Sequence, residues 1–107
     1  MNLLPWRAHP AARTELSDAA FWYERQEPGL GDRLVVQVAV AIDFVRAWPD
    51  ASPLWRGRQR VPAVRRKSVK GFPYGVVYLV RDGEVIVIAY AHDKRRPGYW
   101  RSRLGGV

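Results

Sequence analysis

The sequence contains no cysteine, and this absence excludes several kinds of chemistry. A chain without cysteine forms no disulfide and no cysteine-ligated zinc or iron–sulfur site, and it has no thiol nucleophile. The reducing cytoplasm is therefore the predicted location. No apolar run approaches the roughly 20 residues of a membrane-spanning helix, so no contact with a membrane is expected. Pro5 and Arg7 interrupt the stretch where a secretion signal is continuously apolar, so no such signal is predicted.

Histidines are too few, and carboxylates too scattered, for a metal site. The two histidines are His9 and His92, and neither stands in a cluster of acidic residues. The chain also lacks a G-x-x-x-x-G-K-[ST] loop and a G-x-G-x-x-G motif before a helix, the patterns that hold nucleotide phosphates. We therefore predict no metal and no cofactor. His9 falls where a strand is expected to lead into a helix, and a local structural role is expected for it.

Positive charge is concentrated in the second half of the chain. The formal net charge is +8 over 107 residues. Residues 1–53 hold five arginines and seven acidic residues, whereas residues 54–107 hold thirteen basic and three acidic residues. The length predicts a single domain, 1–107, and the charge asymmetry predicts an anionic partner. Nucleic acid and an acidic protein segment both fit, and the alternative is an ordinary solvated basic surface.

Two stretches have the apolar spacing of helices. The first is predicted from Pro10 to about Gln26, and its acidic residues, Glu15 among them, are expected to face the solvent. The second is predicted from about Asp32 to Ala47, with Asp32 or Gly31 as its cap. The turn between them predicts an antiparallel helical hairpin. Burial over much of the second helix is predicted from its many apolar residues, which are Leu34, Val35, Val38, Ala39, Val40, Ala41, Ile42 and Val45.

Four stretches are predicted as strands, at residues 3–8, 61–69, 75–80 and 85–91. Asp82-Gly83 joins the last two, and this dipeptide is the strongest short-range signal of a β-hairpin because both turn positions favour positive φ. Both of these runs are apolar throughout, which predicts central strands covered on both faces. The predicted order is βααβββ. This is an α+β fold in which a helical hairpin packs on a mostly antiparallel four-stranded sheet.

Several segments along the chain resemble the RelE/ParE superfamily of toxins from bacterial type II toxin–antitoxin systems. In order, they read A-R-T-E-L-S-D-A-A-F-W-Y-E-R-Q, P-G-L-G-D-R, A-W-P, V-R-R-K-S-V, F-P-Y-G-V-V-Y and V-I-V-I-A-Y-A-H-D-K-R-R-P-G-Y-W. The resemblance implies the same βααβββ fold. It also implies a small basic toxin that a cognate acidic antitoxin, encoded beside it, holds inactive in a hetero-oligomer.

The resemblance implies one of two activities. Toxins similar to RelE cut mRNA on the ribosome, whereas toxins similar to ParE poison DNA gyrase and are not nucleases. If the chain is an enzyme, it is therefore a metal-independent mRNA endoribonuclease. Cleavage requires cations to stabilise the phosphorane and groups that move protons, and the candidates for these roles are Arg65, Lys67, His92, Arg95 and Tyr99. The candidates for contact with target or antitoxin are Arg66, Lys70, Tyr74, Arg96 and Trp100.

Each candidate also has a structural interpretation. His92 fits a proton-transfer role and equally an ordinary position at a strand end. Tyr99 and Trp100 fit stacking on bases, a groove for the antitoxin, or the end of the core. Because the helical hairpin is long and no unambiguous acid–base set is present, we favour ParE-like action on gyrase. RelE-like cleavage is the alternative, and a non-toxic basic nucleic-acid-binding module is the third hypothesis.

Overall fold

A computed structural model of the chain describes residues 2–57 and 62–106. The strands are β1 (Trp6–Ala8), β2 (Arg65–Ser68), β3 (Tyr74–Arg81) and β4 (Glu84–His92), and the helices are α1 (Pro10–Gln26) and α2 (Leu30–Ala47). Two short 3₁₀ helices, η1 (Trp55–Gly57) and η2 (Arg101–Gly106), complete the described elements. The order of the main elements is βααβββ, so the predicted α+β fold is confirmed.

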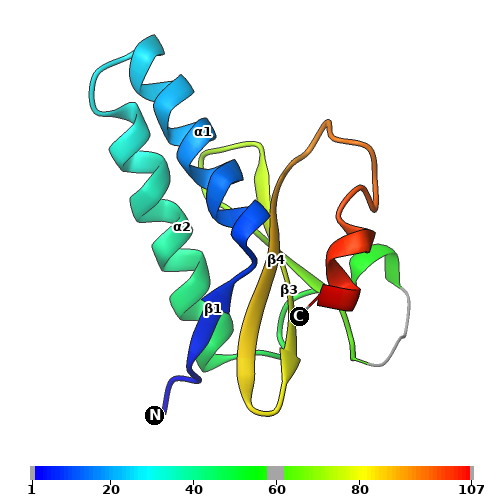
Figure 1. Ribbon diagram of the computed structural model, residues 1–107. Coiled ribbons are helices and arrows are strands. Elements are labelled where there is room, and N and C mark those ends of the chain that lie inside the picture. Colours follow the sequence, from blue (N-terminus) through cyan, green and yellow to red (C-terminus); the bar gives the residue numbers. More distant parts are fainter. Residues whose placement is uncertain (1, 58–61, 107) are drawn as a thin grey trace.

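The four strands form one sheet in the order β1-β4-β3-β2. The β2–β3 and β3–β4 pairs are antiparallel, and β1 is parallel to β4. Asp82 and Gly83 both have positive φ, at 53° and 73°, and form the predicted tight turn between β3 and β4. These two strands are central and buried on both faces, as their continuous apolar sequence predicts. Figure 1 shows the sheet between the helical hairpin and the C-terminal segment.

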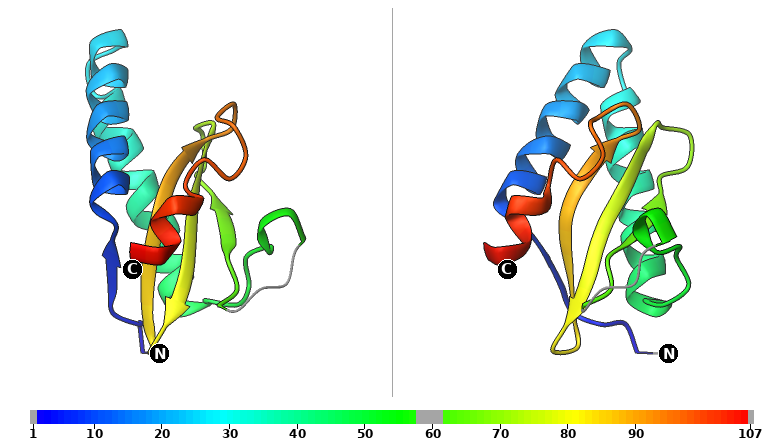
Figure 2. Two further views of the ribbon diagram at one scale, coloured as in Figure 1. Left: turned by 45° about the vertical axis from the view of Figure 1, so that its right-hand side comes forward. Right: turned by 90° about the vertical axis from the view of Figure 1, so that its right-hand side faces the viewer.

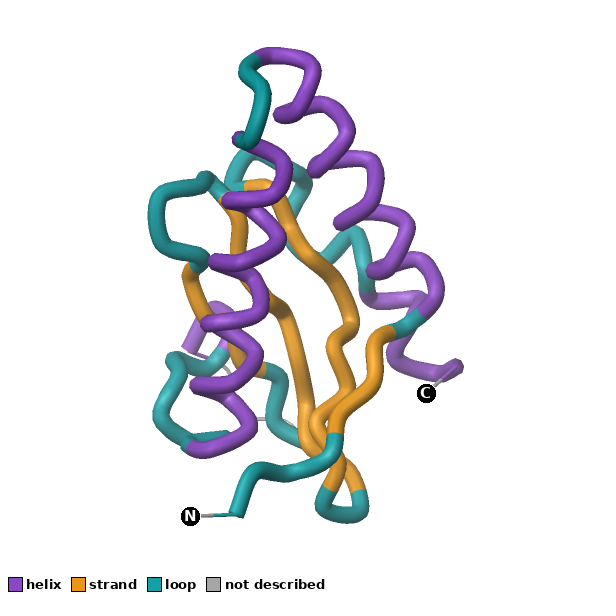
Figure 3. Tube along the Cα trace, turned by 90° about the vertical axis from the view of Figure 1, so that its left-hand side faces the viewer, coloured by secondary structure: helices purple, strands orange, loops and turns teal. Residues whose placement is uncertain are grey.

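The helical hairpin packs on one face of the sheet, and its tip projects beyond the strands (Figures 2 and 3). Pro10 occupies the first turn of α1, and His9 caps this helix by accepting a hydrogen bond from the Ala11 amide at 3.1 Å. The predicted cap of α2 is wrong, because the N-cap residue is Gly29, and the side chain that binds amides at this helix start is Glu24 of α1. The Glu24 carboxylate accepts hydrogen bonds from the amides of Gly29 and Gly31 at 2.8 and 3.0 Å, which satisfies donors that α2 leaves unpaired at its first turn.

Each face of the sheet has its own apolar core. The helical face packs Leu34, Val38 and Val45 of α2 against inward residues of β3 and β4. The opposite face is covered by the segments around η1 and η2, which contribute Trp55 and Trp100 to the second core. This second layer was not predicted from the sequence. It explains why neither face of the central strands is polar.

The predicted starts of two strands are corrected. β1 is shorter than residues 3–8 and starts at Trp6, just after Pro5. β2 starts at Arg65 rather than at 61, which lies outside the described residues. Before it, the chain pairs with the preceding loop, as shown by the hydrogen bond from the Trp55 amide to the Val64 carbonyl at 2.8 Å. η2 was not predicted. Among the described residues, no helix is both long and apolar enough to cross a membrane.

The prediction that α2 is buried over much of its surface is also wrong. Leu34, Val38 and Val45 are at most 2% exposed, but Val35 and Val40 are 43% and 57% exposed. The sheet and α1 together cover only one side of this helix. Its outer side therefore leaves apolar residues in contact with solvent.

Candidate functional site: a cationic hollow at the end of β4

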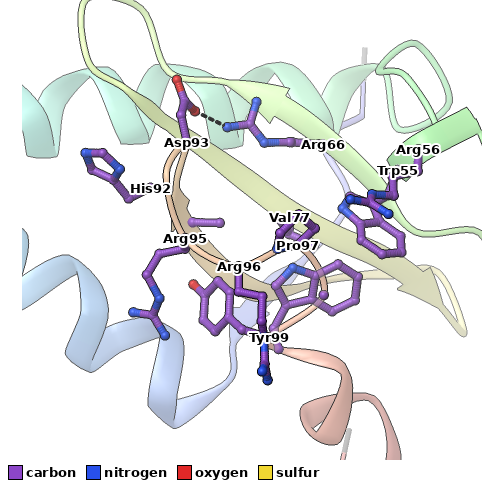
Figure 4. Close-up of a pocket in the computed structure, with 13 residues that line it drawn as sticks. Trp55, Arg56, Arg66, Val77, His92, Asp93, Arg95, Arg96, Pro97 and Tyr99 are labelled. Atoms are coloured by element: carbon purple, nitrogen blue, oxygen red, sulfur yellow. Dashed lines mark hydrogen bonds and ion pairs between the residues drawn. The ribbon is translucent and has the colours of Figure 1, made fainter.

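The candidate site lies on the sheet face opposite the helices, where β4 ends and the chain turns back. It is a hollow of about 430 Å³, which we call the cationic hollow. Figure 4 shows side chains from β2, from the end of β4 and from the loop after it gathered around this space. The lining residues are Trp55, Arg56, Arg66, Val77, Ala91, His92, Asp93, Arg95, Arg96, Pro97, Gly98, Tyr99 and Trp100. Four of these are arginines and one is acidic, so the hollow suits an anionic group.

Arg66 is held at the wall of the hollow by a glycine and a carboxylate. Its guanidinium lies against the backbone of Gly75, where a Cβ atom would come within 2.3 Å of the Arg66 Cζ. The same guanidinium forms an ion pair with Asp93 (Figure 4). Both side chains of this pair are partly exposed, so the pair contributes little to stability and mainly fixes the direction of Arg66.

His92 is the last residue of β4 and is the only histidine that lines the hollow among the described residues. Its Nδ1 accepts a hydrogen bond from the Lys94 amide at 3.0 Å. In the neutral ring this assigns the proton to Nε2. The ring also packs edge-on against Tyr74, with centroids 5.0 Å apart. His92 is thus positioned both by the strand end and by the following turn, and its Nε2 remains available as a donor.

Two tryptophans form the floor between the hollow and the second core. Trp55 and Trp100 pack edge-to-face with centroids 4.9 Å apart. Arg56 and Arg101 place their Cζ atoms 5.5 and 5.2 Å from the Trp55 ring, within reach of a cation–π interaction. Trp100 is only 2% exposed. Its ring is therefore occupied by packing in the core, one of the positions that the sequence leaves open, and its contact with a target or antitoxin stays a prediction.

Tyr99 points away from solvent and into a network centred on Glu15 of α1. The Tyr99 hydroxyl donates to Glu15 Oε2 at 2.6 Å. Arg103 binds both carboxylate oxygens, at 2.9 and 3.0 Å, and also donates to the Ile88 carbonyl at 3.1 Å. The Tyr90 amide donates to Glu15 Oε1 at 3.1 Å. Glu15 therefore faces the interior, and the prediction that it faces the solvent is wrong.

This network determines the acid–base properties of Tyr99. Burial, followed by the hydrogen bond to the Glu15 carboxylate, raises the pKa of the Tyr99 hydroxyl well above its usual value. The hydrogen bond to Glu15 likewise raises the pKa of Arg103. The Arg95 guanidinium lies over the Tyr99 ring, with its Cζ 3.9 Å from the centroid. A hydroxyl that already donates to a carboxylate and resists ionisation is a poor proton-transfer group near neutral pH.

The structure brings only part of the predicted residue set together. Arg66, His92, Arg95, Arg96, Tyr99 and Trp100 line the cationic hollow, whereas Arg65, Lys67, Lys70 and Tyr74 do not. Arg65 donates to the Ser52 carbonyl at 2.8 Å. Lys67 lies on the side of β2 that faces α2 and not on the side of the hollow, with its Nζ 4.5 Å from the Phe44 ring centroid. Lys70 is exposed in the turn after β2.

Five residues that hold or line the site were missed by the sequence analysis. Trp55 and Arg56 lie in a stretch that reads as a loop, Asp93 follows the end of β4, Glu15 lies far from the hollow in sequence, and Arg103 lies in the short helix η2 that was not predicted. The one signal that could have found Glu15 is its place between apolar residues of α1. Among the described residues, no group of three or more His, Cys, Asp or Glu side chains could hold a metal ion.

Comparisons with known proteins identify the fold. No protein-family model matches the chain, and no curated protein matches it significantly. Among solved structures, it is similar to a chain of the structure described as "Chromosomal ParDE TA system from P. aeruginosa". The TM-score is 0.68 at 15% identity, and the likeness covers 84% of this chain and 96% of that one. The RelE/ParE-like fold that the sequence resemblance implies is thereby confirmed.

Proposed function

We propose that this chain is the growth-inhibiting toxin of a type II toxin–antitoxin system, that it acts by binding a protein target such as DNA gyrase, and that a cognate acidic antitoxin neutralises it. The observation that carries the proposal is the fold likeness, which extends over 84% of this chain and 96% of a chain from a ParDE system. Because function depends on the site rather than on the fold, the residues of the cationic hollow supply the second support.

Charge at the cationic hollow supports an anionic partner. Asp93 is the only carboxylate among its lining residues in the described chain, and this carboxylate is paired with Arg66. Arg95 and Arg96 extend from the exposed loop that follows β4. An acidic segment of an antitoxin and an acidic surface of a target would compete for the same arginines, which is a direct means of neutralisation.

The separation of the candidate side chains supports binding rather than RNA cleavage. Tyr99 is bound to Glu15, and Arg65 and Lys67 face away from His92. A cleavage site needs its base, its acid and its charge-stabilising groups within hydrogen-bond reach of one phosphate. The favoured target is therefore a protein, and gyrase is the candidate that the ParE resemblance implies.

One observation favours the alternative, which is RelE-like cleavage of ribosome-bound mRNA. His92 lines the same hollow as Arg66, Arg95 and Arg96, and its Nε2 is not used by the local hydrogen bond. An imidazole beside several arginines can donate a proton while the cations hold a phosphate. In this alternative His92, not Tyr99, is the proton-transfer group.

Induction of the chain in a bacterial host separates these functions. The proposal predicts growth arrest, an SOS response, and inhibition of gyrase supercoiling by the purified protein, with mRNA intact. The double variant Arg95→Ala/Arg96→Ala should lose the inhibition, whereas Arg13→Ala, an exposed arginine on α1 away from the hollow, should retain it. New mRNA 5′ ends that disappear in His92→Ala would instead establish the nuclease. Absence of growth arrest in hosts from several bacterial groups would contradict the toxin assignment.

A further inference from the structure

Arg95 also borders a second pocket, which lies between α1, the start of β3 and the end of β4. Its volume is about 330 Å³, and we call it the aromatic pocket. Four aromatic side chains line it, from α1, β3, β4 and the loop after β4: Trp22, Tyr74, Tyr90 and Tyr99. Aromatic rings attract cations through the negative potential of their faces, and a group of rings is typical of sites that bind organic cations.

Two carboxylates complete the lining of the aromatic pocket. Glu15 and Asp18 both come from α1. Glu15 is committed to the network with Tyr99 and Arg103. Asp18 is exposed, and it forms no ion pair with another residue of the described chain. One side of the pocket therefore carries a negative charge without a counter-ion among these residues, and this charge favours a cation.

The guanidinium of Arg95 already occupies this environment. Its Cζ lies 3.9 Å from the centroid of the Tyr99 ring, and Arg95 is the only arginine or lysine among the described residues that line the pocket. In Figure 4 its side chain points away from Arg66 and Asp93. No carboxylate in the described part of the chain forms an ion pair with Arg95, and a cation–π contact at an exposed position is weak. The pocket thus holds a cation of the protein itself, by a contact that another cation can replace.

Arg95 lines the cationic hollow as well as the aromatic pocket. It lies in the exposed loop after β4, so a rotation of its side chain can carry the guanidinium from the Tyr99 ring toward the hollow. The charge that faces the hollow therefore depends on whether the aromatic pocket retains Arg95. Two sites that share one side chain in this way are coupled, and such coupling acts equally in both directions.

We propose that the aromatic pocket binds an organic cation, a guanidinium or alkylammonium group on a short apolar stem, in exchange for Arg95, and that the released Arg95 turns toward the cationic hollow. The exchange keeps one cation against the Tyr99 ring. A neutral group would gain nothing from Asp18, and an anion would be repelled by it. Ala19 and Trp22 offer an apolar wall for the stem. A free small cation and an arginine side chain of another chain share this chemistry. The site goes beyond the proposed function and does not depend on toxicity.

Titration of the purified full-length chain with matched small molecules tests the site. The probes are butylguanidinium and its neutral counterpart butylurea, at constant ionic strength, and an acetylated, amidated arginine represents the side chain of a protein. Calorimetry measures affinity, and NMR shifts of the Trp22 indole and of amides 92–99 locate the ligand. Butylguanidinium should bind at least about fivefold more tightly than butylurea. Binding of the arginine derivative above or below butylguanidinium then distinguishes a protein side chain from a free cation as the source.

Two pairs of variants separate the pocket from the rest of the helical surface. Trp22→Ala should weaken the binding of butylguanidinium by about fivefold. Phe21→Ala should leave it unchanged, because Phe21 is an exposed aromatic residue of the same helix that does not line the pocket. Asp18→Asn should likewise weaken binding, whereas Asp32→Asn, which changes an exposed carboxylate of α2 outside the pocket, should not. Circular dichroism checks that every variant is folded.

Arg95→Ala should have the opposite effect. Loss of the resident cation should strengthen the binding of butylguanidinium by about threefold or more. Arg96→Ala removes the same charge one residue further along, but Arg96 does not line the aromatic pocket, so its effect should be smaller. Inorganic phosphate is the probe for the cationic hollow. Saturation with butylguanidinium should raise the affinity for phosphate, phosphate should raise the affinity for butylguanidinium by the same factor, and Arg95→Ala should abolish both effects.

Three results would overturn the inference. Equal affinity for butylguanidinium and butylurea, or binding of neither, excludes a cation site. Equal losses in Trp22→Ala and Phe21→Ala place the contact on the general surface of α1. Weaker binding in Arg95→Ala, or a phosphate affinity that does not respond to butylguanidinium, shows that Arg95 is not the group exchanged. None of these measurements needs growth arrest, so a failure of the proposed function leaves them readable.

Discussion

Replacement of Glu15 by alanine tests the network that fastens the C-terminal segment to α1. The two oxygens of Glu15 accept hydrogen bonds from Tyr90, Tyr99 and Arg103 at distances of 2.6 to 3.1 Å. These partners come from β4, from the loop that borders the cationic hollow, and from η2. One carboxylate therefore connects α1 to three segments that lie 75, 84 and 88 residues further along the chain. Its removal leaves Arg103 largely buried without its counter-ion.

The cost follows from the exposure of the pair. The side chains of Arg103 and Glu15 are 15% and 16% exposed. Removal of one partner from a buried pair costs about 3–5 kcal/mol, and the remaining solvent contact places this case near the lower end, at about 3 kcal/mol. For a chain of this size, that loss lowers the melting temperature by roughly 12 °C. Glu15→Gln keeps the size of the side chain and should cost less.

Denaturant unfolding and thermal melts measure this loss. Asp18→Ala is the matched control, because Asp18 lies on the same helix with its side chain exposed. In the double variant Glu15→Ala/Arg103→Met no unpaired charge is left. Its destabilisation should therefore fall short of the sum of the two single variants by about 2 kcal/mol. If Glu15→Ala melts within a degree or two of Asp18→Ala, Glu15 does not connect these segments and the reasoning fails.

Three further predictions concern the core and the hollow. Burial raises the pKa of Tyr90 from its ordinary 10 to about 12. The stability that the protonated Tyr90 contributes is therefore complete below pH 10 and is lost as the pH rises toward 12. Tyr90→Phe should flatten this loss in alkaline unfolding curves, and an unchanged curve would contradict the prediction. Trp100→Ala should cost about 3–5 kcal/mol in denaturant unfolding because its ring fills the second core, and a loss below about 1 kcal/mol would place it at the surface. Gly75→Ala should displace the Arg66 guanidinium and separate it from Asp93. The loss of folding free energy should be less than about 1 kcal/mol, because the ion pair is partly exposed. A crystal structure and a thermal melt measure the two effects, and an Arg66 that has not moved would refute the close approach.

Local chemistry explains which parts of the fold the sequence predicts. Pro10 at the start of α1, and Asp82-Gly83 between two apolar runs, each act on the backbone of their immediate neighbours. Signals of this kind can be read without knowledge of the rest of the chain. The cap of α2 could not be read in this way, since it comes from Glu24 on the preceding helix. The starts of the short edge strands could not be read from the sequence either, because they depend on pairing with a neighbouring strand and not on local propensity.

The candidate site is less predictable than the fold because it depends on which side of an element each residue faces. Glu15 reads as a solvent-facing residue of an amphipathic helix until Arg103 is placed beside it. Trp100 fits a binding surface and equally the end of the core until the segment around Trp55 is placed against it. In both cases the deciding partner lies in a segment without regular periodicity, η1 or η2. Sequence patterns identify the layer on the helical side of the sheet, but not the layer opposite it.

Alternation along β2 divides the basic residues of this strand between two surfaces. Arg66 faces the cationic hollow, and its neighbour Lys67 lies over Phe44 on the side of α2. Both residues nevertheless line the groove of about 330 Å³ beside the end of α2, so the basic run connects two surfaces and is not one flat patch. β2 is an edge strand, but the preceding loop already pairs with its start, through the Leu54–Arg65 bridge and a hydrogen bond from the Arg66 amide to the Pro53 carbonyl at 3.1 Å. A segment of this chain therefore already occupies part of the edge that a partner would use.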